Sequence, residues 1–317
     1  MLPLLAAGTW ILYSKFMIEH DLPLPEALEA KRVVFRSKLG INLNYYVDDQ
    51  AQGRPLVLIH GLNSGASAYE MKPLFEHYRS TRPVYALELP GFGFSARPRR
   101  TYTPQYFAEA ILDFLETQVG EAADLVALSL SCEFAARAAV ALPDRIHSLA
   151  FISPTGLGRE SGGAALQLGG PGSRAETVYG LIANPIWSQA AFDLLTLRVS
   201  LERIYRLCFV KPAPTDLVDY AYATTHQPGA KEVPLAAVSG LLNTADVRDR
   251  FYKKVKTPAL VLYDRDPFAR FDALPDLLAQ NDQWQGARIV PSLGMPHFEK
   301  LTETTSALQS FWAAFDS

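Results

Sequence analysis

The sequence predicts an α/β protein with a mostly parallel sheet of eight strands and helices on both faces. The main observation behind this prediction is that, from residue 31 onward, short apolar runs typical of strands alternate with stretches of helical periodicity. Such an alternation indicates a parallel sheet that is covered on both sides. It stops between residues 157 and 255, where only helices are expected, and this interval predicts an inserted helical cap.

The predicted elements begin with two strands joined by a hairpin turn at Leu39-Gly40, after which strands and helices alternate. The chain therefore divides into an N-terminal segment of residues 1–30, a core of residues 31–156 and 256–317, and the cap of residues 157–255. The strands are expected at residues 31–35, 41–47, 56–60, 84–87, 125–128, 149–153, 259–263 and 288–290, and the main helices of the core at residues 68–78, 104–118 and 132–142.

Composition excludes several classes of function. The chain has 317 residues, of which 49% are hydrophobic, and this is enough for one large core with a cap. Its formal net charge is −3 and it has no long basic run, so we expect no nucleic-acid partner. The two cysteines, Cys132 and Cys208, lie far apart without the spacing of metal ligands. Such usage fits a reducing, cytoplasmic location, and no metal or organic cofactor is implied.

The N-terminal segment is unusually apolar. Residues 1–14 carry no charge, and after Lys15 the apolar character resumes over residues 16–18. The run falls short of the roughly 20 residues that a spanning helix needs, and it lacks the basic start and the cleavage site of a secretory signal. Two alternatives follow: a helix packed on the body of the protein, or an anchor through which residues 1–18 make peripheral contact with a membrane.

One serine lies at the most informative point of the core. Ser129 follows the apolar run 125–128 and precedes an Ala-rich helix, so it is predicted to occupy a tight strand-to-helix turn. Such a turn projects the hydroxyl away from both elements and requires small residues two positions before and after the serine. Ala127 and Ser131 meet this requirement, although the usual pattern has glycine at both positions. The turn is therefore predicted to be a nucleophile elbow.

Four further motifs accompany the elbow in a fixed order. His60-Gly61-Leu62-Asn63 follows the third predicted strand, and Glu88-Leu89-Pro90-Gly91-Phe92-Gly93-Phe94-Ser95 follows the fourth. Leu262-Tyr263-Asp264-Arg265-Asp266 comes at the end of the seventh strand, and Gly294-Met295-Pro296-His297-Phe298 comes after the last. On these motifs the chain, from residue 31 to the end, resembles the α/β-hydrolase superfamily, in the form that has a serine nucleophile and a helical cap.

The resemblance implies a catalytic triad of Ser129, Asp266 and His297. In this family a histidine takes the proton of the serine, and a carboxylate orients that histidine. His297 is the one histidine in a loop after the last predicted strand. Asp266 matches the family position of the carboxylate if the loop is one residue shorter than usual, and Asp264 is the alternative. Asp246 and Asp272 are more distant alternatives.

The same resemblance assigns the oxyanion hole to the backbone N–H groups of Leu62 and Leu130, which would stabilise the negative charge of the tetrahedral intermediate. A serine nucleophile implies acyl transfer to water, so we expect hydrolysis of a carboxylic ester through an acyl-serine intermediate. In the cap, the aromatic residues Trp187, Phe192 and Tyr205 are candidates for lining a pocket for a small hydrophobic, ester-like substrate.

Two alternatives to an esterase stay open. Carbon–carbon bond, lactone and thioester hydrolases use a similar triad, and the sequence does not separate them. Ser131 and Cys132 stand after the nucleophile, where glycine is usual. This departure leaves room for a non-catalytic, ligand-binding member of the superfamily.

Overall fold

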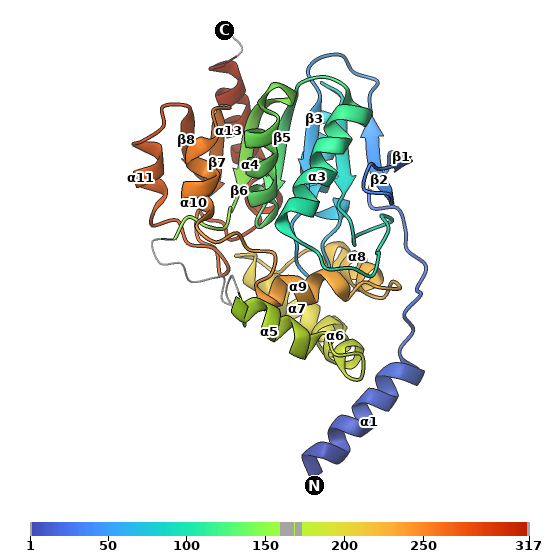
Figure 1. The fold of residues 1–317 in the computed structure, drawn as a ribbon. Coiled ribbons are helices and arrows are strands. Elements are labelled where there is room, and N and C mark those ends of the chain that lie inside the picture. The colour runs from blue at the N-terminus through green and yellow to red at the C-terminus, as the bar shows by residue number, and fades with distance from the viewer. Residues whose placement is uncertain (1, 159–167, 169–172, 316–317) are drawn as a thin grey trace.

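An eight-stranded sheet forms the centre of the structure, a computed structural model that describes residues 2–158, 168 and 173–315 (Figure 1). The strands are β1 (Lys31–Arg36), β2 (Asn42–Asp48), β3 (Leu56–Ile59), β4 (Val84–Glu88), β5 (Ala123–Leu128), β6 (Ile146–Ile152), β7 (Ala259–Tyr263) and β8 (Trp284–Arg288). Their order is β1-β2-β4-β3-β5-β6-β7-β8. β2 is antiparallel to both of its neighbours, and all other pairs are parallel. The predicted fold class is therefore confirmed.

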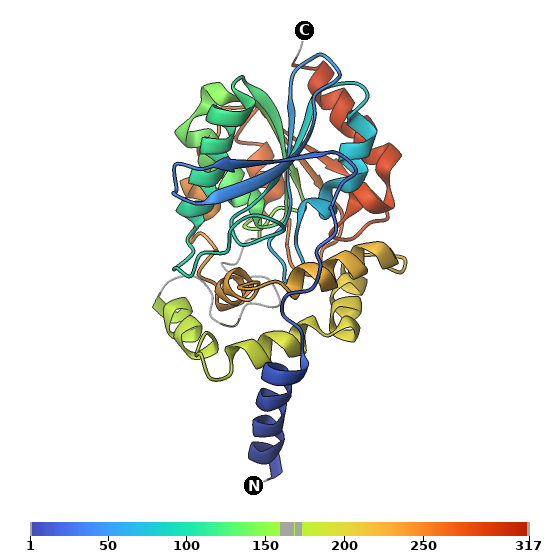
Figure 2. The ribbon, with the colours of Figure 1, turned by 90° about the vertical axis from the view of Figure 1, so that its right-hand side faces the viewer.

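Helices cover both faces of the sheet (Figure 2). On one face, α3 (Pro104–Phe114) and α4 (Ser131–Ala141) pack together, with the rings of Phe107 and Phe134 stacked at 4.9 Å. The other face is covered by α2 (Lys72–Tyr78) and α13 (Leu301–Ala313). The shorter helices are η1 (Ala68–Met71), η2 (Leu115–Val119), η3 (Pro143–Arg145), α10 (Val247–Arg250), η4 (Tyr252–Lys254), α11 (Leu274–Leu278) and α12 (Pro296–Glu299).

A helical insert between β6 and β7 lies at one end of the sheet (Figure 1). Its helices are α5 (Ser173–Ile182), α6 (Ser188–Thr196), α7 (Arg198–Leu207), α8 (Thr215–Thr225) and α9 (Glu232–Ser239). It corresponds to the predicted cap, whose exact boundaries stay a prediction. Beyond the insert, α1 (Leu2–Met17) extends away from the body of the molecule (Figure 2). Within the described residues, no helix has both the length and the apolarity that crossing a membrane requires.

One predicted strand position was wrong in detail, and one predicted helix is divided into two. The last strand, expected at residues 288–290, lies at Trp284–Arg288. This strand is at the edge of the sheet and only Trp284 in it is buried, so its pairing with β7 determines its position and apolar periodicity does not mark it. The helix expected at residues 68–78 changes from a 3-10 helix to an α-helix at Lys72, next to Pro73.

Candidate active site

Ser129 occupies the predicted turn between β5 and α4. Its φ of +55° lies in the left-handed region, which residues other than glycine rarely adopt and which is common at functional sites. The backbone N–H of Ser129 donates to the carbonyl oxygen of Ile152 at 2.8 Å, which fixes the turn to the end of β6. The Ser129 hydroxyl forms no hydrogen bond with any other described residue and lies at a pocket. The conformation is that of a nucleophile elbow.

Ser131, in the position where glycine is usual, has a structural role. Its hydroxyl donates to the carbonyl oxygen of His60 at 2.6 Å and so ties the start of α4 to the loop after β3. Cys132 is fully buried, and burial raises the pKa of its thiol well above the ordinary value. The departure from glycine therefore strengthens the contact between the elbow and this loop without obstructing the turn.

The loop after β3 is held by His60 and leaves two backbone donors free. His60 accepts the N–H of Leu89 at Nε2 (3.1 Å) and, through Nδ1, donates to the Gly61 carbonyl (2.6 Å). Burial lowers the pKa of His60 to about 4, so the ring is neutral and structural. The backbone N–H groups of Leu62 and Leu130 donate to no other described residue, and both residues line the pocket. This arrangement is compatible with their predicted role as oxyanion donors.

A buried carboxyl group, that of Glu70, holds the same loop through hydrogen bonds. Glu70 accepts the N–H of Gly61 at 2.9 Å and the side-chain amide of Asn63. Burial nevertheless raises the pKa of Glu70 to about 7, because desolvation outweighs these two hydrogen bonds. No sequence pattern marks this group, because Glu70 lies in a helical stretch outside the motifs that indicate the site.

We expect Glu70→Gln to remove a pH-dependent part of the stability. Between its ordinary pKa near 4.5 and the folded value of about 7, the folded state holds a proton that the unfolded state has lost. Unfolding then releases this proton, so the free energy of unfolding of the wild type falls as pH rises through this window. Relative to Glu70→Gln, the wild type should lose on the order of 2–3 kcal/mol between pH 5 and pH 8, measured by urea denaturation.

The matched control for this measurement is Glu76→Gln, which alters an exposed carboxylate of α2. Its stability difference from the wild type should not change over the same pH range. A stability difference between the wild type and Glu70→Gln that is constant with pH would show that Glu70 is charged in the folded protein at pH 5.

The pocket over Ser129 lies between the core and the cap and has a volume of about 160 Å³. The core contributes Leu62, Leu128 and Leu130, which form an apolar floor. The cap contributes Ile204 and Tyr205 of α7, together with residues of α9. Most of the wall is thus apolar, and the pocket is accessible to small hydrophobic molecules.

Asp266 lines this pocket together with Ser129. Its Oδ1 accepts the backbone N–H groups of Phe268 (2.6 Å) and Ala269 (2.9 Å), and burial raises its pKa to about 6. The alternative carboxylate, Asp264, points elsewhere and is bound by Arg288 at 2.9 Å and by the N–H of Ser292 at 3.1 Å. The geometry therefore favours Asp266 over Asp264 as the carboxylate next to the elbow.

The structure does not bring His297 to Ser129 and Asp266. His297 is fully buried outside the pocket, and its Nε2 lies 2.7 Å from the backbone carbonyl oxygen of Glu70. A carbonyl only accepts, so Nε2 carries the proton, and Nδ1 has no partner among the described residues. A triad histidine has the opposite arrangement, with Nε2 facing the serine and Nδ1–H facing the carboxylate. Burial also lowers the pKa of His297 to about 4.

Met295 instead lies in the pocket with Ser129 and Asp266. Met295 precedes the short helix α12 with a non-helical backbone (φ −126°, ψ 62°), and it lines the pocket. His297, the second residue of α12, is instead bound to the Glu70 carbonyl of η1. The sequence pattern predicts a loop around His297, and a loop does not restrict the direction of the side chain. The pocket thus contains a thioether, which cannot accept the proton of Ser129 as an imidazole does.

Of the three aromatic residues expected to line the pocket, only Tyr205 does so. Trp187 lies on the surface of the cap, where its indole N–H donates to the carbonyl oxygen of Leu181, and Phe192 is fully buried within the cap. These two predictions were wrong because apolar side chains also serve to pack the cap helices on one another. Cys208 lines the pocket as well, but burial raises the pKa of its thiol strongly, which disfavours a thiolate nucleophile.

Among the described residues, no group of three or more His, Cys, Asp or Glu side chains is placed to hold a metal ion.

The chain matches a family model described as the alpha/beta hydrolase family over residues 56–305. Among curated proteins, 2-hydroxymuconate semialdehyde hydrolase from Pseudomonas sp. (strain CF600) is 29% identical over 120 residues. That match covers 37% of this chain and 42% of the relative, so less than half of the relative's length is matched.

Solved structures with the same fold include enzymes of more than one kind. A thermophilic esterase from Thermogutta terrifontis has a TM-score of 0.68 at 16% identity and covers 91% of this chain and 100% of that structure. A membrane phospholipase A has a TM-score of 0.66 at 19% identity, with 98% of this chain and 93% of that structure covered. At such low identity these similarities show the shared fold alone.

Proposed function

Because the chain belongs to the alpha/beta hydrolase family but no histidine among the described residues lines the pocket, where Gly294 and Met295 lie with Asp266, we propose that it binds a short apolar acyl or aryl compound over Ser129 and hydrolyses it only slowly. The observation that carries this proposal is the position of Met295 in the pocket, with His297 bound to the Glu70 carbonyl. Ser129 then has no imidazole to take its proton, and an unactivated serine hydroxyl is a poor nucleophile.

The size of the pocket supports a small ligand. A dry cavity of about 150 Å³ holds one benzene ring, and the pocket here is about 160 Å³. The free backbone N–H groups of Leu62 and Leu130 suit a ligand that carries a carbonyl or carboxylate oxygen. A short carboxylic acid or a monocyclic ketone meets both conditions, whereas a long acyl chain exceeds the volume.

Efficient ester hydrolysis, with Ser129, Asp266 and His297 as a working triad and Leu62 and Leu130 as oxyanion donors, is the second candidate. The left-handed conformation of Ser129 favours it, because such strain is retained mainly where a hydroxyl must be presented to a substrate. The proteins compared above are named as an esterase, a phospholipase and a semialdehyde hydrolase. The family match therefore supports hydrolytic chemistry without choosing between ester, carbon–carbon, lactone and thioester bonds.

One set of measurements separates the two candidates. We expect butanoate and hexanoate to raise the melting temperature of the wild type, and decanoate to raise it less. The wild type should hydrolyse p-nitrophenyl butyrate at a rate within about tenfold of that of Ser129→Ala. A general base would typically add about 10²–10⁴-fold, and this contribution is absent when no base is placed next to Ser129. His297→Gln should leave this rate unchanged, because His297 lies outside the pocket.

The opposite result is equally clear. Fast turnover that disappears both in Ser129→Ala and in His297→Gln, with both variants folded, would establish the working triad and overturn the slow-hydrolysis proposal. A protein that neither shifts its melting temperature with any of the three acids nor hydrolyses the ester would remove both candidates.

A further inference from the structure

An exposed apolar surface is formed by α1 and the neighbouring part of the cap. Phe16 and Met17 of α1 are each 70% exposed, which is unusual for large apolar side chains that adjoin one another. We call the whole set the outer apolar surface. It comprises Leu12, Tyr13, Phe16 and Met17 on α1, and Leu194, Leu195, Leu197 and Val199 where the end of α6 joins the start of α7.

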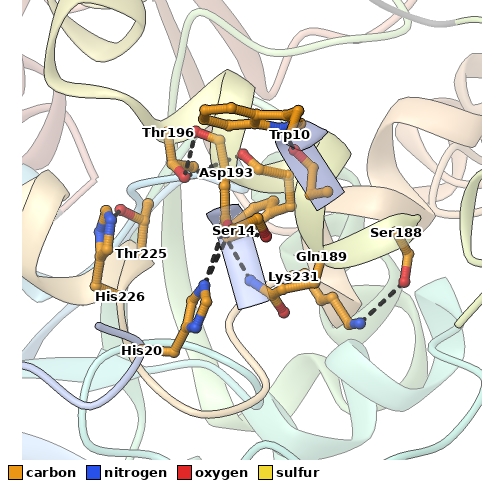
Figure 3. Close-up of polar contacts among 12 residues, drawn as sticks. Trp10, Ser14, His20, Ser188, Gln189, Asp193, Thr196, Thr225, His226 and Lys231 are labelled. Carbon is orange, nitrogen blue, oxygen red and sulfur yellow. Dashed lines mark hydrogen bonds and ion pairs between the residues drawn. The ribbon is translucent and has the colours of Figure 1, made fainter. Parts of the chain in front are cut away.

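The attachment of α1 to the cap is specific (Figure 3). Asp193 of α6 is buried, and its carboxylate accepts the Ser14 hydroxyl at 2.5 Å and the Gln189 amide at 2.8 Å. The Nε2 atom of His20 lies 3.0 Å from the same carboxylate. Nearby, the indole N–H of Trp10 donates to the carbonyl oxygen of Ala190 at 2.7 Å. A buried carboxylate with several donors fixes α1 in one position, so the outer apolar surface belongs to the folded protein.

The composition of α1 points to lipid as the occupant. The helix Leu2–Met17 carries a single charge, Lys15 in its last turn, and residues 6–9 are exposed as well. A helix that is apolar around its circumference is stable within a protein core or within a membrane. Because α1 extends away from the body (Figures 1 and 2), its residues 6–9 are not covered by any core that the structure describes.

Length and flanking groups define how the helix meets lipid. Sixteen residues span about 24 Å, which is less than the roughly 30 Å of a hydrocarbon core. Tyr13 and Lys15 carry the polar tips that side chains at a membrane interface extend toward water. The adjoining helix α7 carries three arginines and one glutamate, which suits a surface with anionic headgroups.

We propose that α1 inserts from one side into a lipid bilayer and that the segment joining α6 to α7 rests on the headgroups. This membrane docking does not depend on the proposed function, but it would place the ligand pocket close to the bilayer. The helix α7, next to the proposed membrane surface, also supplies Ile204 and Tyr205 to the pocket, and Cys208 directly after it lines the pocket too. One wall of the ligand pocket therefore belongs to the element that would face the bilayer, from which an apolar ligand can partition.

Flotation of the full chain with lipid vesicles tests this proposal. We expect the wild type to float with phosphatidylcholine vesicles, and more strongly when phosphatidylglycerol is added. The double variant Leu12→Asp/Phe16→Asp should reduce the vesicle-bound fraction at least about tenfold, since each change removes one large apolar side chain from lipid. Val34→Asp is the matched control, because Val34 is 54% exposed on the edge strand β1, and its binding should equal that of the wild type.

Several results would overturn the proposal. They include a wild type that floats with neither vesicle, and a double variant that floats as well as the wild type. Flotation that requires phosphatidylglycerol and disappears in salt would indicate adsorption by charge without insertion. A wild type that is a dimer by light scattering and binds no vesicle, with a monomeric double variant, would assign the outer apolar surface to a second copy of the chain.

Discussion

Met295→His should raise the rate of p-nitrophenyl butyrate hydrolysis by about 10²–10⁴-fold over the wild type, which is the range that a correctly placed general base contributes. Met295 lines the pocket with Ser129 and Asp266, as does the preceding Gly294. A histidine at this position would present an imidazole to the serine hydroxyl, and the other parts of the site are already present. The prediction is therefore a gain of activity from one substitution.

The position of Asp266 supports this result. A Cβ atom added at Gly294 would lie 2.8 Å from the Oδ2 of Asp266, so this carboxylate oxygen abuts the backbone just before residue 295. The pKa of Asp266, raised by burial to about 6, leaves its carboxylate ionised above that pH and able to orient an imidazole. The rate of the variant should then rise with pH through the pKa of the new histidine, near 6.5 if it is unperturbed, because only the neutral imidazole accepts a proton.

Two controls accompany this variant. Met295→Leu keeps an apolar side chain of similar size and should not increase the rate. Met295→His combined with Ser129→Ala should return to the wild-type rate, because the new imidazole then has no nucleophile to activate. If Met295→His leaves the rate unchanged while remaining folded, the geometry inferred for residue 295 is wrong, and the base must be sought elsewhere.

Sequence patterns predicted part of the site, but they did not predict which of Met295 and His297 faces the pocket. The strand β5, the turn at Ser129 that follows it and the apolar residues around that turn all follow from local patterns of apolar and small residues, and the structure contains each of them. The direction of a side chain in a short helix is set by where that helix begins. The start of α12 at Pro296 is not marked by any capping side chain, so the sequence could not tell which residue of the loop faces the pocket.

A similar limit applies to the prediction of which cap residues line the pocket. Trp187 and Phe192 are aromatic residues of the predicted cap, as Tyr205 is, yet only Tyr205 reaches the pocket. Aromatic residues bury large areas wherever helices meet, and composition does not distinguish a pocket wall from a helix contact. The order in which the cap helices pack decides this, and it depends on contacts between residues that are distant in the sequence.

Gly93→Ala should lower the free energy of unfolding by about 3–5 kcal/mol, a loss in the range of the most damaging single substitutions. Gly93 has a φ of +51°, and an added Cβ would lie 1.8 Å from the Oε1 atom of Glu88. The left-handed backbone alone costs a residue with a side chain about 1–2 kcal/mol. The remaining cost arises because the buried Glu88 carboxyl would have to move, and its Oε2 accepts the N–H of Phe94 at 2.6 Å.

Gly120→Ala separates the two contributions to this loss. Gly120 also has a positive φ, +80°, but an added Cβ there would meet no atom within 4 Å. Urea denaturation of this control should therefore show only the backbone cost of about 1–2 kcal/mol. Equal losses in the two variants would mean that the Glu88 carboxyl can rotate away from residue 93 at little cost. The larger loss at Gly93 would instead show that Glu88, held by Phe94, requires a glycine at this position in the loop that follows β4.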